Sequence, residues 1–208
     1  MQEHVAKALE WNFNLLKMHL ADFSDSDMLT RPVPGANHTA WQVGHLICFE
    51  NRVVKAVGGS MPDLPDGFEQ EYSKETAKSD DPAQFDQKDS LISLYDRQRK
   101  ATIAWATSLK AEDLDRATPE GLRNLVPNIA AVLDLISSHV TMHVGQIQVI
   151  RRKLASRFCS KLVGNSDERE LTQIAPLAAW FFEQSLIDSK RAATFFASRL
   201  LLFSVNQQ

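Results

Sequence analysis

Four long segments of this sequence repeat apolar residues every three or four positions, and this spacing constrains the fold more than any other feature. The segments cover approximately residues 2–22, 37–58, 87–109 and 128–155. Stretches rich in Pro, Gly, Asp and Ser separate these segments. Neither the segments nor the stretches between them show the apolar–polar alternation typical of a strand. Each segment has one apolar face that must be buried. We therefore predict an all-α protein built on a four-helix bundle.

The four segments end near residue 155, which predicts a division of the chain. We expect residues 1–155 to form the bundle and residues 156–208 to form a C-terminal extension, itself helical. The extension contains the polar run "NSDERE" at residues 165–170, followed by a high density of Phe and Leu. These apolar side chains need burial somewhere, but the sequence does not say against what.

Composition excludes several classes of protein. The net charge of -3 gives no electrostatic reason to expect nucleic acid as a partner. No uncharged apolar run reaches about 18 residues, so we expect no transmembrane helix and no membrane partner. The two cysteines, Cys48 and Cys159, form no CxxC motif, which favours a reducing, cytoplasmic location.

Two histidines four residues apart interrupt the apolar face of the last segment. His139 and His143 project side by side from a helix, and their neighbours on that face are apolar. A buried imidazole must satisfy its nitrogens, and a divalent metal ion shared by the pair would do so. Two other interpretations stay open: the spacing arises by chance in many helices, and His139 could bond to a buried carbonyl or to Asn12.

The second segment offers a third ligand, His45, on a face shared with Trp41, Cys48, Phe49 and Arg52. Catalytic metal centres commonly use three protein ligands and leave a position open for water or substrate. Facing helices of a bundle can direct such ligands to one point. His45 could equally be a core histidine that is satisfied by hydrogen bonds.

Three further residues are weaker candidates for the same site. Gln146 lies one turn beyond His143 and could hydrogen-bond to a metal ligand. Arg52 lies two turns beyond His45 and could bind an anionic substrate, or extend into solvent. Glu50 is a weak candidate for a general base, because its position five residues after His45 points it away.

These motifs resemble those of the DinB/YfiT-like superfamily. The resemblance lies in "TAWQVGHLICFENR" in the second segment and "SSHVTMHVGQIQVIRRKL" in the fourth, and it covers approximately residues 1–155. It implies a four-helix bundle with a centre of three histidines, His45, His139 and His143, that holds Zn, Ni or Fe. It also implies a homodimer, and close helix packing at Gly145. Similar proteins usually end soon after the fourth helix, so the extension departs from the pattern.

The resemblance favours an enzyme over a purely structural protein. Family members include transferases that use low-molecular-weight thiols, so the expected partner is a small-molecule substrate such as one of these thiols. Transfer of a thiol to an electrophile and metal-assisted hydrolysis both fit a three-histidine centre. The long segment Ser60–Gln87 would shape the substrate pocket. The alternatives are a non-catalytic metal-binding stress protein or small-molecule-binding protein, and a structural protein whose histidines are satisfied by hydrogen bonds.

Overall fold

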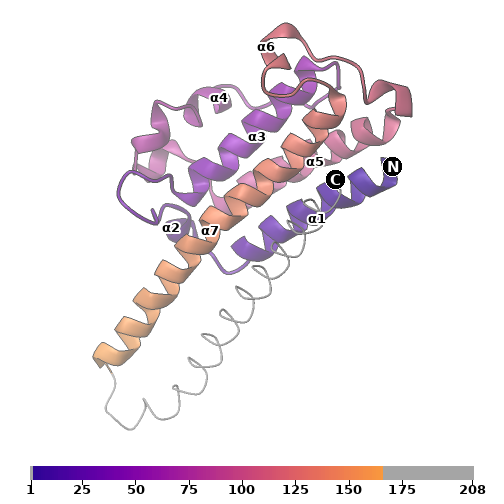
Figure 1. Ribbon diagram of the computed structural model, residues 1–208. Coiled ribbons are helices and arrows are strands. Elements are labelled where there is room, and N and C mark those ends of the chain that lie inside the picture. The colour runs from indigo at the N-terminus through magenta and orange to yellow at the C-terminus, as the bar shows by residue number, and fades with distance from the viewer. Residues whose placement is uncertain (1, 166–208) are drawn as a thin grey trace. The chain divides into compact units, whose positions relative to one another are not determined.

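The computed structural model describes residues 2–165, and its four long helices lie side by side as a bundle (Figure 1). They are α1 (Gln2–Leu20), α3 (Thr39–Ala56), α5 (Lys88–Ser108) and α7 (Ile129–Asn165). Within these residues the only β-type pairing is an isolated bridge between Ala117 and Asn128. The predicted all-α fold is therefore confirmed. Short elements occupy the connections: α2 (Asp25–Met28), α4 (Phe68–Glu71), α6 (Glu120–Arg123) and 3₁₀ turns at Thr76–Lys78, Pro82–Gln84 and Ala111–Asp113.

The chain divides into a compact unit, Met1–Ala155, and a second unit, Ser156–Gln208. The bundle belongs to the first unit. Residues 156–165 of the predicted C-terminal extension continue helix α7, and the rest lies outside the described residues, so its helical character and its role stay predictions. Of the helices that the structure describes, none combines the length and the apolar character that crossing a membrane requires.

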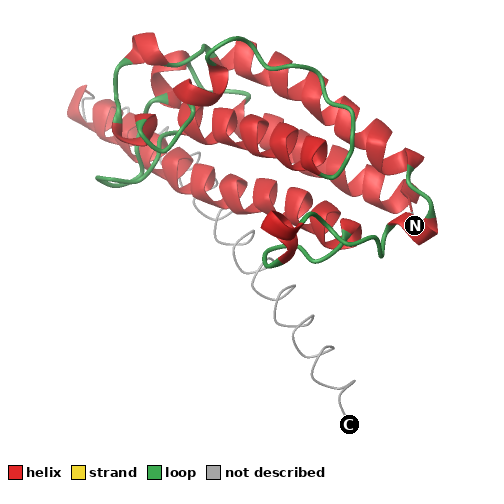
Figure 2. Ribbon diagram, turned by 90° about the horizontal axis from the view of Figure 1, so that it is seen from above, coloured by secondary structure: helices red, strands yellow, loops and turns green. Residues whose placement is uncertain are grey.

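Helices α3 and α5 run parallel to each other, and their cross-contacts show it. Near the starts of the two helices, Leu46 belongs to the same core cluster as Leu91. Near their ends, Val54 and Trp105 belong together to a second core cluster. Parallel neighbours need a connection that returns along the bundle, which explains the long segment between Val57 and Lys88 (Figure 2).

Helix α7 lies between α1 and α3. The side chain of Asn12 in α1 donates two hydrogen bonds to Ser137 in α7, at 2.6 Å to the hydroxyl and 3.1 Å to the carbonyl. On the other side, Gln42 in α3 contacts His143. Helix α7 runs parallel to α1 and antiparallel to α3. The first turns of α3 therefore face the middle of α7. This register positions the histidines.

The N-terminus of α3 has an unusual capping residue. It is His38, whose Nδ1 accepts a hydrogen bond from the Trp41 backbone N–H at 3.1 Å. An imidazole nitrogen replaces the usual side-chain oxygen at this position. His38 is fully buried, so the helix begins inside the protein rather than at its surface.

Buried apolar side chains fill the bundle from end to end, but the interior also holds a charged pair. Arg99 and Glu50 are 1% and 2% exposed, with 2.7 Å between Nη2 and Oε2, and Arg99 also donates to the Tyr95 hydroxyl. The core side chains include Leu9, Phe13, Leu16, Leu46, Ile47, Leu91, Val140, Val144, Ile147 and Ile150.

Candidate metal centre

Helices α3 and α7 bring three histidines together at the point where their antiparallel faces meet. One ring nitrogen of each of His45, His139 and His143 lies within 4.8 Å of those of the other two. The ring centroids of His139 and His143 are 4.8 Å apart, and that of His45 is 5.2 Å and 5.5 Å from them. The residues that the sequence selected as possible ligands therefore form one cluster.

All three imidazoles are held in the neutral form, which is the form that binds metals. Burial lowers the pKa of His143 to about 3 and that of His139 to about 4, helped by the neighbouring histidines. The pKa of His45 is also lowered, by burial and by the positive charge of Arg52. Near neutral pH the cluster therefore offers nitrogen lone pairs rather than positive charges.

The hydrogen bonds of the cluster leave part of it unsatisfied. His143 Nδ1 lies 2.9 Å from the Gln42 side-chain oxygen, and His143 Nε2 lies 3.2 Å from His139 Nε2. His139 Nδ1 is buried without a hydrogen-bond partner among the described residues. An orphaned buried nitrogen and two ring nitrogens that face each other are what a site selected for ion binding presents. The donor set, three neutral imidazoles, fits Zn, Ni or Fe.

Aromatic side chains surround the cluster. The Trp41 ring stacks on His45, with 4.9 Å between centroids and 8° between planes, and Phe49 contacts His139 edge to face at 4.3 Å. His143 is buried, whereas His45 and His139 are only half-buried. An apolar wall with one partly open side would exclude most water yet admit a small ligand.

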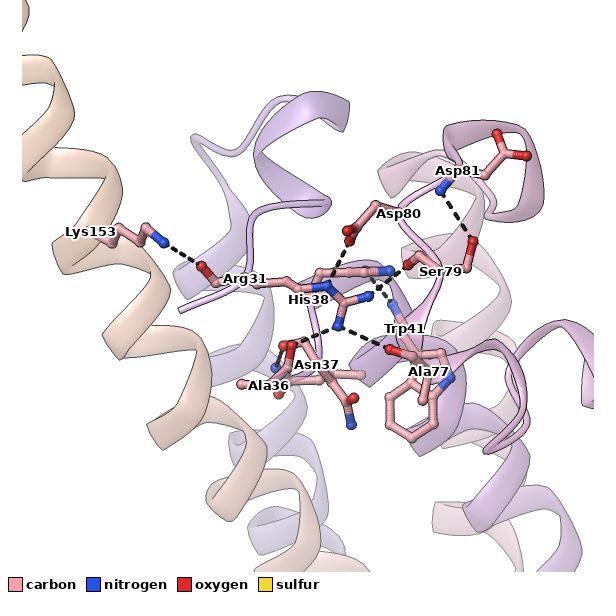
Figure 3. Close-up of polar contacts among 11 residues, drawn as sticks. Arg31, Ala36, Asn37, His38, Trp41, Ala77, Ser79, Asp80, Asp81 and Lys153 are labelled. Atoms are coloured by element: carbon pink, nitrogen blue, oxygen red, sulfur yellow. Dashed lines mark hydrogen bonds and ion pairs between the residues drawn. The ribbon is translucent and has the colours of Figure 1, made fainter. Parts of the chain in front are cut away.

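A network around Arg31 lies next to Trp41 at the start of α3 (Figure 3). The Arg31 guanidinium pairs with Asp80 and donates to three carbonyls, those of Ala36, Ala77 and Ser79. It thereby ties the segment after α4 to the segment before α3. Within the same loop, the Ser73 carbonyl accepts a hydrogen bond from Trp41 Nε1 at 2.9 Å.

The segment Ser60–Gln87 thus holds Trp41 in place, but the hollow it forms is elsewhere. An open cavity of about 460 Å³ lies between this segment and the outer part of α3. Asn51, Lys55 and residues 63–70 line it, and none of the three histidines does. That this segment shapes a substrate pocket at the histidines stays a prediction.

The structure separates the three weaker candidates from the cluster or leaves them at its edge. Gln146 is exposed and makes no hydrogen bond within the described residues. Glu50 is buried against Arg99, on the side of α3 that faces α5. Arg52 is exposed on the same side of α3 as His45 and acts on it only through its charge.

Two other hypotheses from the sequence, for Gly145 and Asn12, are also corrected. A methyl group on Gly145 would meet no atom within 4 Å, so this glycine does not serve close helix packing. Gly44 does, because a Cβ there would overlap the ring of Tyr72. Asn12 bonds to Ser137 rather than to His139. Cys48 is buried, and burial raises the pKa of its thiol to about 12, which disfavours a thiolate ligand.

Sequence reasoning missed Gln42, the residue that contacts His143. Its side chain is 1% exposed, and its amide nitrogen donates to the Asn37 carbonyl at 2.8 Å. A signal was present, because Gln42 is a polar residue one turn before His45 on a helix whose neighbouring positions are apolar.

Comparison with known proteins agrees with this architecture. A family model described as the DinB superfamily matches residues 8–147. A conserved protein from Enterococcus faecalis has a similar structure, with 14% identity, a TM-score of 0.54, and coverage of 73% of this chain and 95% of that one. YfiT from Bacillus subtilis, described as a probable metal-dependent hydrolase with an unusual four-helix bundle topology, has 17% identity, a TM-score of 0.54, and coverage of 74% and 87%. The search among curated proteins found no match.

Proposed function

Because the chain belongs to the DinB superfamily, we propose that it is a metal-dependent enzyme whose divalent ion is held by His45, His139 and His143. The observation that carries the proposal is the convergence of three neutral ring nitrogens within 4.8 Å. Three protein ligands leave open positions for a small molecule. Zn, Ni and Fe all accept such a donor set, and the choice among them stays open.

The proposed reaction is transfer of a low-molecular-weight thiol to an electrophile. A divalent ion at this centre would lower the pKa of a bound thiol or water and so supply a nucleophile near neutral pH. The protein's own contribution is to fix the three imidazoles, to exclude water with Trp41 and Phe49, and to leave His45 and His139 partly open.

Arg52 supports a substrate that carries a negative charge. It is exposed, forms no ion pair within the described residues, and its charge reaches His45. A carboxylate on the thiol could pair with this guanidinium while the sulfur occupies the centre. Reversal of the charge, Arg52→Glu, should raise the KM for an anionic thiol several-fold, whereas Arg97→Glu on α5 should not.

Metal-assisted hydrolysis is the second proposal, and the description of YfiT favours it. Water would then take the place of the thiol. A non-catalytic metal-binding or small-molecule-binding protein is the alternative, since Glu50, the general base that the sequence offered, is paired with Arg99. The two reactions and the alternative share the same metal site and differ in turnover.

Elemental mass spectrometry of untagged protein tests the metal site. We expect close to one equivalent of Zn, Ni or Fe, and its loss in His143→Ala. His19→Ala is the matched control, because His19 bonds to the Leu15 carbonyl and lies outside the cluster. Absence of metal after reconstitution would refute the proposal. Assays with several thiols and a chromogenic electrophile, and with a chromogenic ester, then separate transfer, hydrolysis and simple binding.

The homodimer and the cytoplasmic location also stay proposals. Several large apolar side chains on α1 and α7 are exposed, namely Trp11, Met18, Met142 and Val149. A second copy of the chain would cover such surface. Sedimentation equilibrium of the full chain distinguishes a dimer from a monomer.

A further inference from the structure

We propose that Gln42 is a positioning residue that fixes the tautomer and orientation of His143, and so aims one lone pair at the centre of the histidine cluster. The inference rests on the proposed metal site for its purpose. The tautomer and orientation of the His143 ring that it predicts do not depend on whether an ion is bound.

The orientation of the Gln42 amide follows from its other partner. The Asn37 backbone carbonyl can only accept a hydrogen bond, and it lies 2.8 Å from Gln42 Nε2. The atom that faces Asn37 must therefore be the amide nitrogen. The atom that faces His143 is then the amide oxygen, which can only accept.

The His143 tautomer follows in turn. Its Nδ1 lies 2.9 Å from an oxygen that can only accept, so Nδ1 carries the hydrogen. In the neutral imidazole, which is the form that binds metals, the other nitrogen, Nε2, then carries the lone pair. That nitrogen faces His139 Nε2 at 3.2 Å, and His45 lies beside it.

The arrangement is rigid because both ends of the Gln42 side chain are held inside the protein. Gln42 and His143 are 1% and 5% exposed, and Asn37 precedes the buried start of α3. Residues that hydrogen-bond to metal-binding histidines usually set their tautomer, and their loss typically weakens metal affinity 10-fold to 100-fold. The sequence had assigned such a role to Gln146, which is exposed.

The first test needs no metal. Long-range ¹H–¹⁵N NMR spectra of the metal-free, full-length protein near pH 7 should show His143 protonated at Nδ1 and not at Nε2. In Gln42→Leu this preference should be lost. His143 protonated at Nε2 in the wild-type protein would overturn the inference, whatever the protein binds.

The second test measures zinc affinity by competition with a chelating dye. Gln42→Leu should bind zinc 10-fold to 100-fold more weakly. Gln42→Glu keeps an acceptor for the Nδ1 hydrogen but loses the donor to the Asn37 carbonyl, so it should bind zinc more tightly than Gln42→Leu and less tightly than wild type. Gln98→Leu is the matched control: Gln98 is also fully buried, bonds to Asn51 and the Pro62 carbonyl, and lies on α5.

The outcomes separate a positioning role from a structural one. If Gln42→Leu and Gln98→Leu lose stability alike but only the first loses zinc affinity, Gln42 acts through His143. Equal zinc affinity in both variants would overturn the inference. If Gln42→Leu does not fold, the site of protonation of His143 in the wild-type protein decides instead. If wild-type protein binds no zinc, the proposed function loses its support, while the tautomer measurement still decides the role of Gln42.

Discussion

His139 and His143 place their Nε2 atoms 3.2 Å apart. Because the Gln42 oxygen requires the hydrogen of His143 on Nδ1, the hydrogen between the two rings must come from His139. His139 then has an unprotonated Nδ1, which is buried and unpartnered within the described residues. An ion that both Nε2 atoms bind would replace this strained arrangement, and this is why the cluster should respond to metal.

We predict that metal stabilises the wild-type protein through these residues. Zinc at a hundredfold excess over its dissociation constant should add about 2.7 kcal/mol to the free energy of unfolding. For a chain of this size that is a rise in Tm of roughly 5–10 °C by differential scanning calorimetry. His139→Ala should show no such rise, and His19→Ala should show all of it. A full rise in His139→Ala would exclude His139 as a ligand.

Two glycines should respond in opposite ways to alanine. Gly44→Ala places a methyl group in the ring of Tyr72, and overpacking of this kind typically costs 1–3 kcal/mol. Gly145→Ala meets open space on an exposed helix face and should gain roughly 1 kcal/mol from helix propensity. Urea unfolding of both variants measures the difference. Destabilisation by Gly145→Ala would mean that this face is covered in solution.

The two glycines also illustrate what the sequence could predict. Apolar spacing was sufficient for the four helices, and the four-residue spacing of His139 and His143 was sufficient to put them on one face, because period and face follow from helix geometry alone. That His45 of another helix joins them rested on the predicted bundle and on the family resemblance. Which glycine contacts a neighbour depends on where the long loop returns. Only the three-dimensional path of that loop places Tyr72 against Gly44.

Glu50 and Gln42 mark the same limit in the site itself. Glu50 sits five residues after His45, and only the parallel packing of α5 reveals its partner, Arg99. Gln42 lies far from His143 in the sequence, and no local pattern links them. Contacts between distant helices depend on register, which periodicity leaves undetermined.

The ion pair of Glu50 and Arg99 should support the fold and not the chemistry. Glu50→Gln leaves a buried guanidinium without its counter-charge and should lower the free energy of unfolding by about 3–5 kcal/mol. The double change Glu50→Leu with Arg99→Met should recover most of that loss, as apolar replacements of buried pairs often do. Urea unfolding measures both. Zinc stoichiometry should remain that of wild type, and its loss from the folded double variant would return Glu50 to the metal site.

The stability of the metal-free protein should fall in mild acid, in part through His38. Burial, with the nearby charge of Arg31, lowers the pKa of His38 from 6.5 to about 4. Between these values the unfolded chain holds the proton and the folded protein does not, so the free energy of unfolding falls as the pH decreases. Above pH 6.5 His38 is mostly unprotonated in both the folded and the unfolded chain, so it no longer lowers the free energy of unfolding. Lowering the pH from 7 to 5 should cost roughly 1–2 kcal/mol through this residue.

His38→Asn isolates this contribution. Asparagine is a good helix N-cap and does not titrate, so it can replace the imidazole that accepts from the Trp41 N–H. Urea midpoints of the chelator-treated protein at pH 7 and pH 5 should differ less in this variant, by roughly 1–2 kcal/mol. His4→Asn, on the exposed face of α1, is the control. An unchanged pH dependence in His38→Asn would mean that His38 is protonated in the folded protein, and the cap would then need another acceptor.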